Sequence, residues 1–335
     1  MELDDFNRWL SERHMGGMWN MSRGPAEEVK PCIWKWDDIH TALTTAAALV
    51  PIDAVAMRTI QLKNPGLSGR MSNTLHFSVQ CLMPGERTKA HRNLVSETRF
   101  VLQAPTGAEF VVDGESFPMS SGDVVTTPNW SWHDHHNGGN EPAIWLDGMD
   151  TRLVGIGKGM NERFGQDQQP IELPEGYSNR LVAHAKPSWI GWDRPTPPPH
   201  RYPWAETYAA LTALREQEIE GHPCDGLQLT FTNPLTGGPT LPTYACEIQL
   251  FNPRQKAGTH RHNSTTIYHA YRGSGVTTIE GERFEWSQGD IFIVPPWTWH
   301  AHENASDTDA ILYSISDWPA MKALALYREE TQESR

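Results

Sequence analysis

The chain has 335 residues, 38% of them hydrophobic and 21% charged, and its 28 basic and 41 acidic side chains give a formal net charge of −13. This length has room for about two domains, and the acidic balance leaves no basic stripe to neutralise the phosphates of a nucleic acid partner. No apolar run approaches the ~20 residues that span a bilayer, so we expect no membrane partner.

The N-terminal 53 residues predict a helical arm. Apolar residues recur at helical spacing over 3–20, which favours a helix that ends near Gly16-Gly17. An Ala-rich stretch predicts a second helix over 38–49, capped by Asp38. The acidic start lacks the features of a signal peptide, and the four cysteines form no CxxC pair. We therefore expect a cytoplasmic protein with reduced thiols.

Two stretches of short strands and turns follow the arm, and a hairpin signal such as Asp113-Gly114 is typical of antiparallel sheets. Between them the Pro-rich run 195–203 excludes a helix or a central strand, and a helix is predicted over 204–220. The pattern predicts a mainly β protein of two antiparallel sandwiches or barrels. The expected order is an arm (1–53), a first β domain (54–153), a linker with a helix (154–226), a second β domain (227–317) and a C-terminal helix (318–335).

One signature occurs twice, with Gly, Pro, Trp, His and Asn at identical spacings 167 residues apart. Upstream lie His91-Arg-Asn93 for the first copy and His260-Arg-His262 for the second. Such a long period indicates a duplicated domain rather than a short-repeat solenoid. The matched positions are Gly122, Pro128, Trp130, His133 and Asn137 in the first copy, and Gly289, Pro295, Trp297, His300 and Asn304 in the second.

The second copy predicts a metal site. Residues two apart on a strand face the same side, so His260 and His262 point together, and His300 comes from a later strand. Three converging imidazoles leave open coordination positions, which suits Fe(II), Mn(II), Ni(II), Cu(II) or Zn(II).

The first copy keeps His91 and His133 but has Asn93 where the second copy has its middle histidine. Glu97 shares strand parity with His91, so His91, His133 and Glu97 can form a face of two histidines and one carboxylate. Asn93 as a weak oxygen ligand and a metal-free pocket are the alternatives.

Arg99 has the same parity and is predicted to point into the first barrel. A buried arginine is costly unless it meets an anion. It can grip a ligand carboxylate with its planar fork, or it can form an internal salt bridge with Glu97.

The two signatures with their upstream histidines resemble the cupin superfamily in its double-domain form, in which each domain is a jelly-roll β-barrel. Further segments resemble the gentisate 1,2-dioxygenase group, which includes salicylate and 1-hydroxy-2-naphthoate dioxygenases. These segments begin at Ile33, Arg58, Trp132, Trp145 and Thr232 and read IWKW, RTIQLKNPGLSG, WHDH, WLDGMD and TNPLTGG.

The resemblance implies an Fe(II)-dependent enzyme that uses O2 to open the ring of an ortho-hydroxy aromatic carboxylate, between the carboxyl-bearing and hydroxyl-bearing carbons. It places the working metal in the first cupin, on His91, the residue at position 93, and His133. It implies that Arg58 and Arg99 bind the carboxylate, that His135 takes the phenolic proton, and that Gln80 and His76 line the pocket.

The asparagine at position 93 leaves two accounts open: the first cupin is catalytic, or catalysis or metal retention has moved to the intact triad of the second. Two rival functions are another bicupin activity, such as decarboxylation or flavonol cleavage, and a non-catalytic binding protein. The terminal helices and the Trp-rich composition also predict a homo-oligomer, a dimer or a tetramer.

Overall fold

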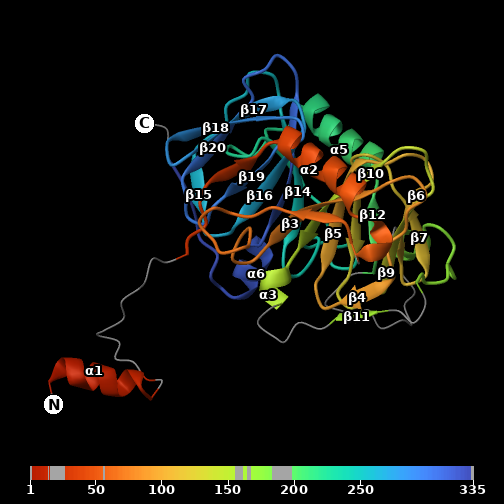
Figure 1. Ribbon diagram of the computed structural model, residues 1–335. Helices are drawn as coiled ribbons and strands as arrows, with labels where there is room; N and C mark the ends of the chain where they lie inside the picture. Colours follow the sequence, from red (N-terminus) through yellow and green to blue (C-terminus); the bar gives the residue numbers. More distant parts are fainter. Residues whose placement is uncertain are drawn as a thin grey trace.

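The computed structural model describes residues 2–13, 15, 27–55, 57–154, 161–163, 167–182 and 198–332. It contains two jelly-roll barrels side by side, each built from a six-stranded and a five-stranded antiparallel sheet, which confirms the predicted fold class (Figure 1). The sheet orders are β12-β8-β5-β10-β3-β2 and β11-β4-β9-β6-β7 in the first cupin, and β1-β19-β16-β21-β14-β13 and β18-β17-β20-β15-β22 in the second.

The strands of the first cupin are β2 (Thr59–Gln61), β3 (His76–Leu82), β4 (His91–Asn93), β5 (Glu97–Gln103), β6 (Ala108–Val112), β7 (Glu115–Pro118), β8 (Val124–Thr127), β9 (His133–Asn137), β10 (Ala143–Met149), β11 (Asn161–Arg163) and β12 (His200–Tyr202). Those of the second are β1 (Cys32–Trp34), β13 (Leu227–Thr230), β14 (Ala245–Phe251), β15 (His260–His262), β16 (Thr266–Arg272), β17 (Ser274–Ile279), β18 (Glu282–Ser287), β19 (Ile291–Val294), β20 (His300–Glu303), β21 (Ala310–Ser316) and β22 (Glu329–Thr331). The helices are α1 (Leu3–Ser11), α2 (Trp36–Leu49), the 3-10 turn η2 (Ile52–Ala54), α3 (Thr151–Val154), α4 (Tyr177–Val182), α5 (Trp204–Glu216) and α6 (Trp318–Ala323).

The duplicated signature folds into a turn, a strand and a corner that deliver a histidine to the next strand. Gly122 and Gly289 open the turns with φ of 90° and 95°, a region that favours glycine. Trp130 and Trp297 turn the corners with φ of 63° and 61°. The signature therefore encodes the local geometry that brings a histidine to the start of β9 and of β20.

The two barrels exchange their leading elements. The arm strand β1 pairs with β19 of the second cupin, and α2 follows it directly. The linker strand β12 pairs with β8 of the first cupin, and α5 follows it in the same way. Each strand–helix unit thus precedes one cupin in the chain and completes the sheet of the other, so the predicted helical arm also contributes a strand to the far barrel.

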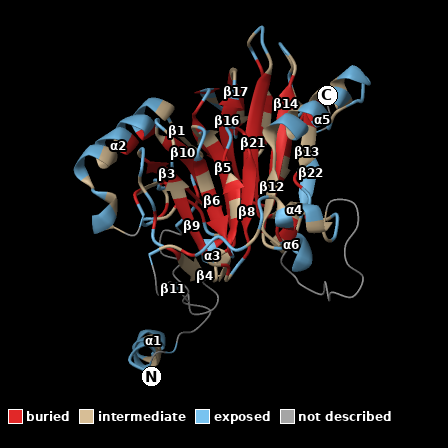
Figure 2. Ribbon diagram, turned by 90° about the vertical axis from the view of Figure 1, so that its right-hand side faces the viewer, coloured by how far each residue is buried: buried red, intermediate tan, exposed pale blue. Residues whose placement is uncertain are grey.

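One hydrophobic core joins the barrels. Phe100 of the first cupin stacks on Tyr313 of the second with ring centroids 4.1 Å apart, and the Tyr244 hydroxyl donates to the Gly148 carbonyl over 2.8 Å. Figure 2 shows this buried band running through the central strands of both barrels. The two cupins are therefore one packed unit.

Several predicted helices have different bounds in the structure. The first helix ends at Ser11, before the predicted end near Gly16-Gly17, and residues 16–26 lie outside the described residues. Asp38 is not a cap, because α2 begins at Trp36 after Lys35. The predicted C-terminal helix ends at Ala323, and β22 follows it. β15 has a free edge that accepts this strand, and the Arg261–Glu330 ion pair (2.6 Å) holds it there.

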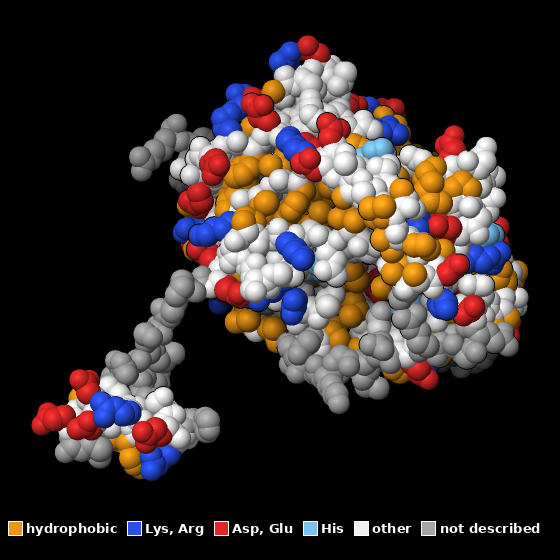
Figure 3. Space-filling view, in the orientation of Figure 1, with side chains coloured by type: hydrophobic (Ala, Val, Ile, Leu, Met, Phe, Trp, Pro, Cys, Tyr) orange, Lys and Arg blue, Asp and Glu red, His pale blue; other side chains and the backbone are white. Residues whose placement is uncertain are grey.

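On the face shown in Figure 3, the described acidic and basic side chains are interspersed and no basic stripe gathers. Helix α1 stands apart from the barrels and buries none of its residues. None of the described helices is long and apolar enough to cross a membrane.

Candidate metal centres and their cavities

Each cupin aligns two of its predicted histidine ligands across one pair of strands. His91 of β4 lies opposite His133 of β9, and His260 of β15 lies opposite His300 of β20. The ring centroids are 4.3 Å apart in both pairs. The duplication is therefore preserved in space, and the centres differ in what completes each pair.

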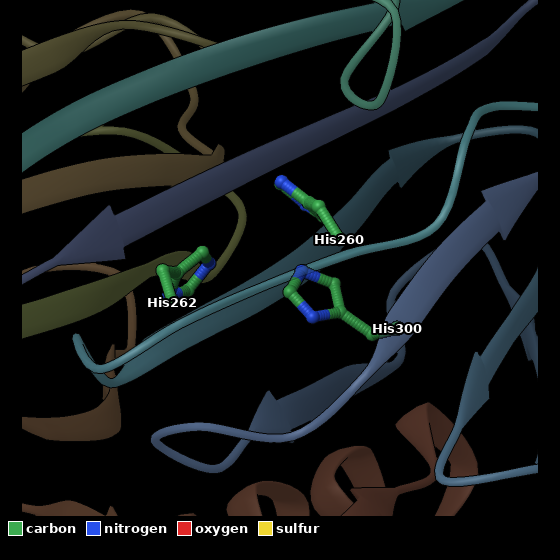
Figure 4. A group of neighbouring side chains, drawn as sticks. All are labelled: His260, His262 and His300. Carbon is green, nitrogen blue, oxygen red and sulfur yellow. The ribbon is translucent and has the colours of Figure 1, made fainter. Parts of the chain in front are cut away.

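In the second cupin His262 completes the set. The ligand nitrogens of His260, His262 and His300 all lie within 4.8 Å of one another, and all three residues are buried. Figure 4 shows the three imidazoles turned toward a common space. Among the residues that the structure describes, this is the one set of three such ligand atoms packed so closely.

The outer nitrogens of these rings are already engaged. The Nδ1 atoms of His262 and His300 lie 3.0 Å from the carbonyls of Ser264 and Thr298. The Nδ1 atom of His260 lies 3.4 Å from a carboxylate oxygen of Glu329. Such partners orient metal-ligating histidines and leave Nε2 free for the ion. The Nε2 atoms of His260 and His300 are buried and have no hydrogen-bond partner, so the triad fits a divalent metal.

The cavity beside this triad is small and acidic. Its volume is about 190 Å³. Asp225, Glu247 and Glu329 line it together with one cation, Lys322. On the Nε2 side of His260, a carboxylate oxygen of Asp225 lies 3.7 Å from that atom. A small cation suits this cavity better than an aromatic anion.

In the first cupin the carboxylate of Glu97 lies beside His133. The Nδ1 atoms of His91 and His133 lie 3.0 Å from the carbonyls of Lys89 and Ser131, as in the second centre. The His133 Nε2 atom is buried, has no hydrogen-bond partner and lies 3.7 Å from an oxygen of Glu97. Two histidines and one carboxylate are the donor set predicted from strand parity.

Asn93 is held by its neighbours. Its amide NH2 donates to Glu97 over 3.0 Å, and its carbonyl oxygen accepts from the Val95 backbone over 2.9 Å. Burial raises the pKa of Glu97, but Arg99 and His133 outweigh it and lower that pKa to about 2. Glu97 is therefore an ionised carboxylate beside the two histidines, with Asn93 orienting it.

Arg99 forms internal bonds rather than facing the cavity with a free fork. Its guanidinium donates to Glu97 and to Thr127, each over 2.5 Å, and to the His135 ring over 3.2 Å. A carboxylate oxygen of Asp147 lies 3.3 Å away. Arg99 thus forms the internal salt bridge that the sequence left open as the alternative to a carboxylate grip.

Three other predicted substrate residues also lie outside the cavity. Arg58 points to the far side of β2, where its guanidinium binds Glu86 and the Cys81 carbonyl. His135 is sandwiched between Phe110 and Trp145, whose ring centroids each lie 4.6 Å from its own. The third is Gln80, buried on β3 beyond the lining. Strand alternation explains why the Arg58 side chain points away from the cavity, because its neighbour Thr59 faces the cavity.

The first-cupin cavity has a volume of about 710 Å³ and reaches His91, Asn93 and Glu97. Of the predicted substrate residues, His76 lines it; burial, and then Arg152, lower the pKa of His76 to about 4. Asp147 also lines it, and burial raises the pKa of Asp147 to about 7.

The sequence reasoning missed two arginines of this cavity, Arg70 and Arg152. Arg70 pairs with Glu27. Within the described part of the chain, the Arg152 guanidinium has no hydrogen bond or ion pair, so its charge is free for a ligand. Arg70 lies in a loop and Arg152 lies in the first turn of α3, where strand parity gives no signal. Asp147 could have been predicted as a cavity residue, because it shares strand parity with Met149 of β10, which also lines the cavity.

Comparisons with known proteins agree with this architecture. The cupin domain family matches residues 78–149 and 247–316. The chain is 34% identical to 5-aminosalicylate 1,2-dioxygenase of Comamonas sp., over 98% of this chain and 90% of that protein. It is 36% identical to 1-hydroxy-2-naphthoate 1,2-dioxygenase of Nocardioides sp. (strain KP7), over 98% and 88%.

Among solved structures, the chain is similar to a salicylate 1,2-dioxygenase from Pseudaminobacter salicylatoxidans. The TM-score is 0.89 at 28% identity, and the match covers 100% of this chain and 99% of that chain. A structure of the same enzyme described as an adduct with gentisate gives a TM-score of 0.90 at 28% identity, over 99% and 94%.

Proposed function

Because the chain belongs to the gentisate 1,2-dioxygenase family of bicupin enzymes, which cleave aromatic rings with O2, we propose that it opens an ortho-hydroxy aromatic carboxylate in the cavity of its first cupin. Gentisate, salicylate, 5-aminosalicylate and 1-hydroxy-2-naphthoate, the compounds named for its relatives, share this chemistry. The ring opens between the carboxyl-bearing and hydroxyl-bearing carbons.

We choose the first cupin because the two cavities differ in volume and in the charged groups that line them. Small-molecule sites have volumes of about 300–1,000 Å³, and the first cavity, at about 710 Å³, lies in this range while the second, at about 190 Å³, does not. Both cavities are lined by three carboxyl groups, but the first also has two arginines, Arg70 and Arg152, whereas the second has one lysine, Lys322. The first cavity therefore accommodates an anionic aromatic acid better than the second.

We propose that His91, His133 and Glu97 hold the metal there, with Fe(II) as the ion. Two histidines and one carboxylate are the donor set of many non-haem Fe(II) oxygenases, and the unpartnered His133 Nε2 atom beside Glu97 fits that role. When bound, such an ion orients substrate and oxygen and relays charge between them. Asn93 positions Glu97 rather than acting as a ligand.

The chain's own residues bind the substrate and hold its proton. Arg152 binds the substrate carboxylate, and His76, neutral at pH 7, contacts the ring from the cavity wall. Asp147 takes the phenolic proton in place of His135, because it lines the cavity and has a pKa near neutrality. Arg99 contributes indirectly, because its ion pairs with Glu97 and Asp147 hold these two carboxylates in place.

The reaction balances without an external reductant. The bond between the two substituted ring carbons breaks, and each carbon receives one atom of O2. The carboxyl-bearing carbon becomes the ketone of a 2-oxo acid, and the hydroxyl-bearing carbon becomes a carboxylic acid. The electrons that reduce O2 come from the substrate itself.

The second cupin is the alternative centre, because its histidine triad is complete. Oxygen uptake on the four acids named above tests the function. His133→Ala should lower turnover at least 100-fold, and His300→Ala, assayed where it stays folded, should retain most of it. The reverse pattern would move the chemistry to the second cupin. Absence of uptake with every acid would leave decarboxylation or ligand binding as the function.

The cellular context remains a set of predictions. All four cysteines are free in the structure, which supports the proposed cytoplasmic, reducing location. Light scattering at micromolar concentration should report a dimer or a tetramer, and a particle of about 38 kDa, the mass of one chain, would contradict the predicted homo-oligomer.

A further inference from the structure

We propose that the triad of the second cupin is a structural metal site that fastens the C-terminal strand β22 to the barrel, with Asp225 as the fourth donor. This role is separate from ring cleavage in the first cupin and does not depend on it.

The first observation is the closed surroundings of the triad. The Asp225 carboxylate lies 3.7 Å from the His260 Nε2 atom and is oriented by Gln249 (2.9 Å) and His222 (2.7 Å). Three histidines and a carboxylate give four donors, and four protein ligands are typical of structural sites, whereas catalytic sites keep an open position. The small cavity agrees, since it leaves little room for a substrate beside the ion.

The second observation is that the C-terminal strand β22, the tail, pairs with β15, the strand that carries His260 and His262. Thr331 and Glu329 of β22 lie opposite His260 and His262 of β15. The Glu329 carboxylate accepts from the outer nitrogen of His260 over 3.4 Å. The tail thus holds the ligands from one side, and a metal would hold them from the other.

The consequence is a linkage between metal and tail. A metal that binds only when His260 and His262 are ordered stabilises the arrangement in which β22 pairs with them. The first cupin has a similar strand, β11, pairing with β4, but Asn93 stands there in place of a histidine. A complete histidine triad beside such a strand is therefore a feature of the second barrel.

Limited proteolysis reads this linkage directly, because Arg328 is exposed and immediately precedes β22. Purified protein is stripped with a chelator, reloaded with Zn(II) or Mn(II), and digested with trypsin, with mass spectrometry following cleavage after Arg328. We expect the loaded protein to lose residues 329–335 at least tenfold more slowly than the stripped protein, and to melt at a higher temperature.

Variants assign the effect to the site. His262→Ala and Asp225→Asn should lower metal affinity at least tenfold and abolish the protection, whereas His133→Ala, in the first cupin, and His200→Ala, in neither centre, should keep it. If a second-cupin variant fails to fold, the comparison of stripped and reloaded His133→Ala protein, which lacks a ligand of the first centre, decides. Equal cleavage with and without metal, or unchanged metal content in His262→Ala, would overturn the proposal. No activity is read, so the result is independent of the proposed reaction.

Discussion

At the residue scale, two arginines of the first cupin differ in how their charge is satisfied. Arg99 lies where strand parity predicts, yet Glu97, Thr127 and Asp147 bind its guanidinium. Arg152 lies at the start of a short helix and keeps its charge free. A buried arginine bonded to protein groups stabilises the site, whereas an exposed arginine without such partners beside a cavity can bind a ligand.

Arg152→Ala should raise the KM for an ortho-hydroxy aromatic acid about tenfold or more, because a hydrogen bond between charged groups contributes about 1.5–3 kcal/mol. kcat should change little, since the proton-handling and metal-binding groups remain. Arg152→Lys should recover part of the loss. Steady-state kinetics on salicylate and gentisate provide the measurement.

The matched control is Arg254→Ala, which removes an exposed arginine from the second cupin. Binding followed by tryptophan fluorescence gives a second readout. The wild type should prefer salicylate to neutral salicylamide, and Arg152→Ala should lose that preference. An unchanged preference would exclude Arg152 as the carboxylate ligand even if turnover fell.

His269 gives a residue-scale prediction on stability. It is buried near Phe100, with neither ring nitrogen hydrogen-bonded, and burial lowers its pKa to about 3. Its unfolded pKa is about 6.5, so it has no effect above that pH. As the pH falls from 6.5 toward 3, the unfolded chain binds a proton that the folded chain does not, and stability decreases.

The loss from this residue should reach about 2 kcal/mol by pH 5. Urea unfolding of wild type and His269→Leu at pH 7 and pH 5 should therefore show a smaller loss in the variant. Parallel loss in the two proteins would mean that His269 is protonated in the folded state.

At the element scale, the acidic residue after each signature glycine anchors the exchanged strand–helix unit. Asp123 accepts from the Trp204 backbone NH over 2.8 Å, and Asp290 accepts from that of Trp36 over 2.8 Å. Each aspartate also binds a cation of the same unit, Arg201 or Lys35. The turn that leads to each histidine thus also caps the first turn of α5 or α2.

Asp123→Ala and Asp290→Ala should each lower the free energy of unfolding by roughly 2 kcal/mol, because each removes a helix cap and a partly buried ion pair. The matched control is Asp307→Ala, which breaks the exposed pair with Arg254 and should change stability little. Urea titration is the measurement. Equal effects of all three substitutions would show that the anchoring contributes nothing.

At the scale of the whole molecule, the reciprocal exchange makes the two cupins mutually dependent. Each lacks an edge strand until the other half of the chain supplies it, and Phe100, Tyr244 and Tyr313 lie in a common core. Small domains with part of their core exposed are marginally stable. The halves should therefore not fold separately.

The two fragments 1–190 and 191–335 should each be insoluble or unfolded when expressed alone. They should form a one-to-one complex when they are coexpressed. Circular dichroism and size-exclusion chromatography with light scattering measure both outcomes. The uncut protein should unfold in a single transition by both cupins' signals. A stably folded single half would contradict the exchange as a determinant of stability.

The sequence by itself determined the duplication, the mainly β class, the complete triad of the second cupin and the matching of His91 with His133. These follow from spacing, because strand parity and turn residues are local properties of the chain. The jelly-roll form of each domain was implied by the resemblance to the cupin superfamily. Only the tertiary structure decided the direction of Arg58, the internal bonding of Arg99 and His135, the free charge of Arg152 and the pairing of β22 with β15. These depend on which distant groups pack together, since a buried charge takes the partner that packing brings nearest, and spacing along the chain does not identify that partner.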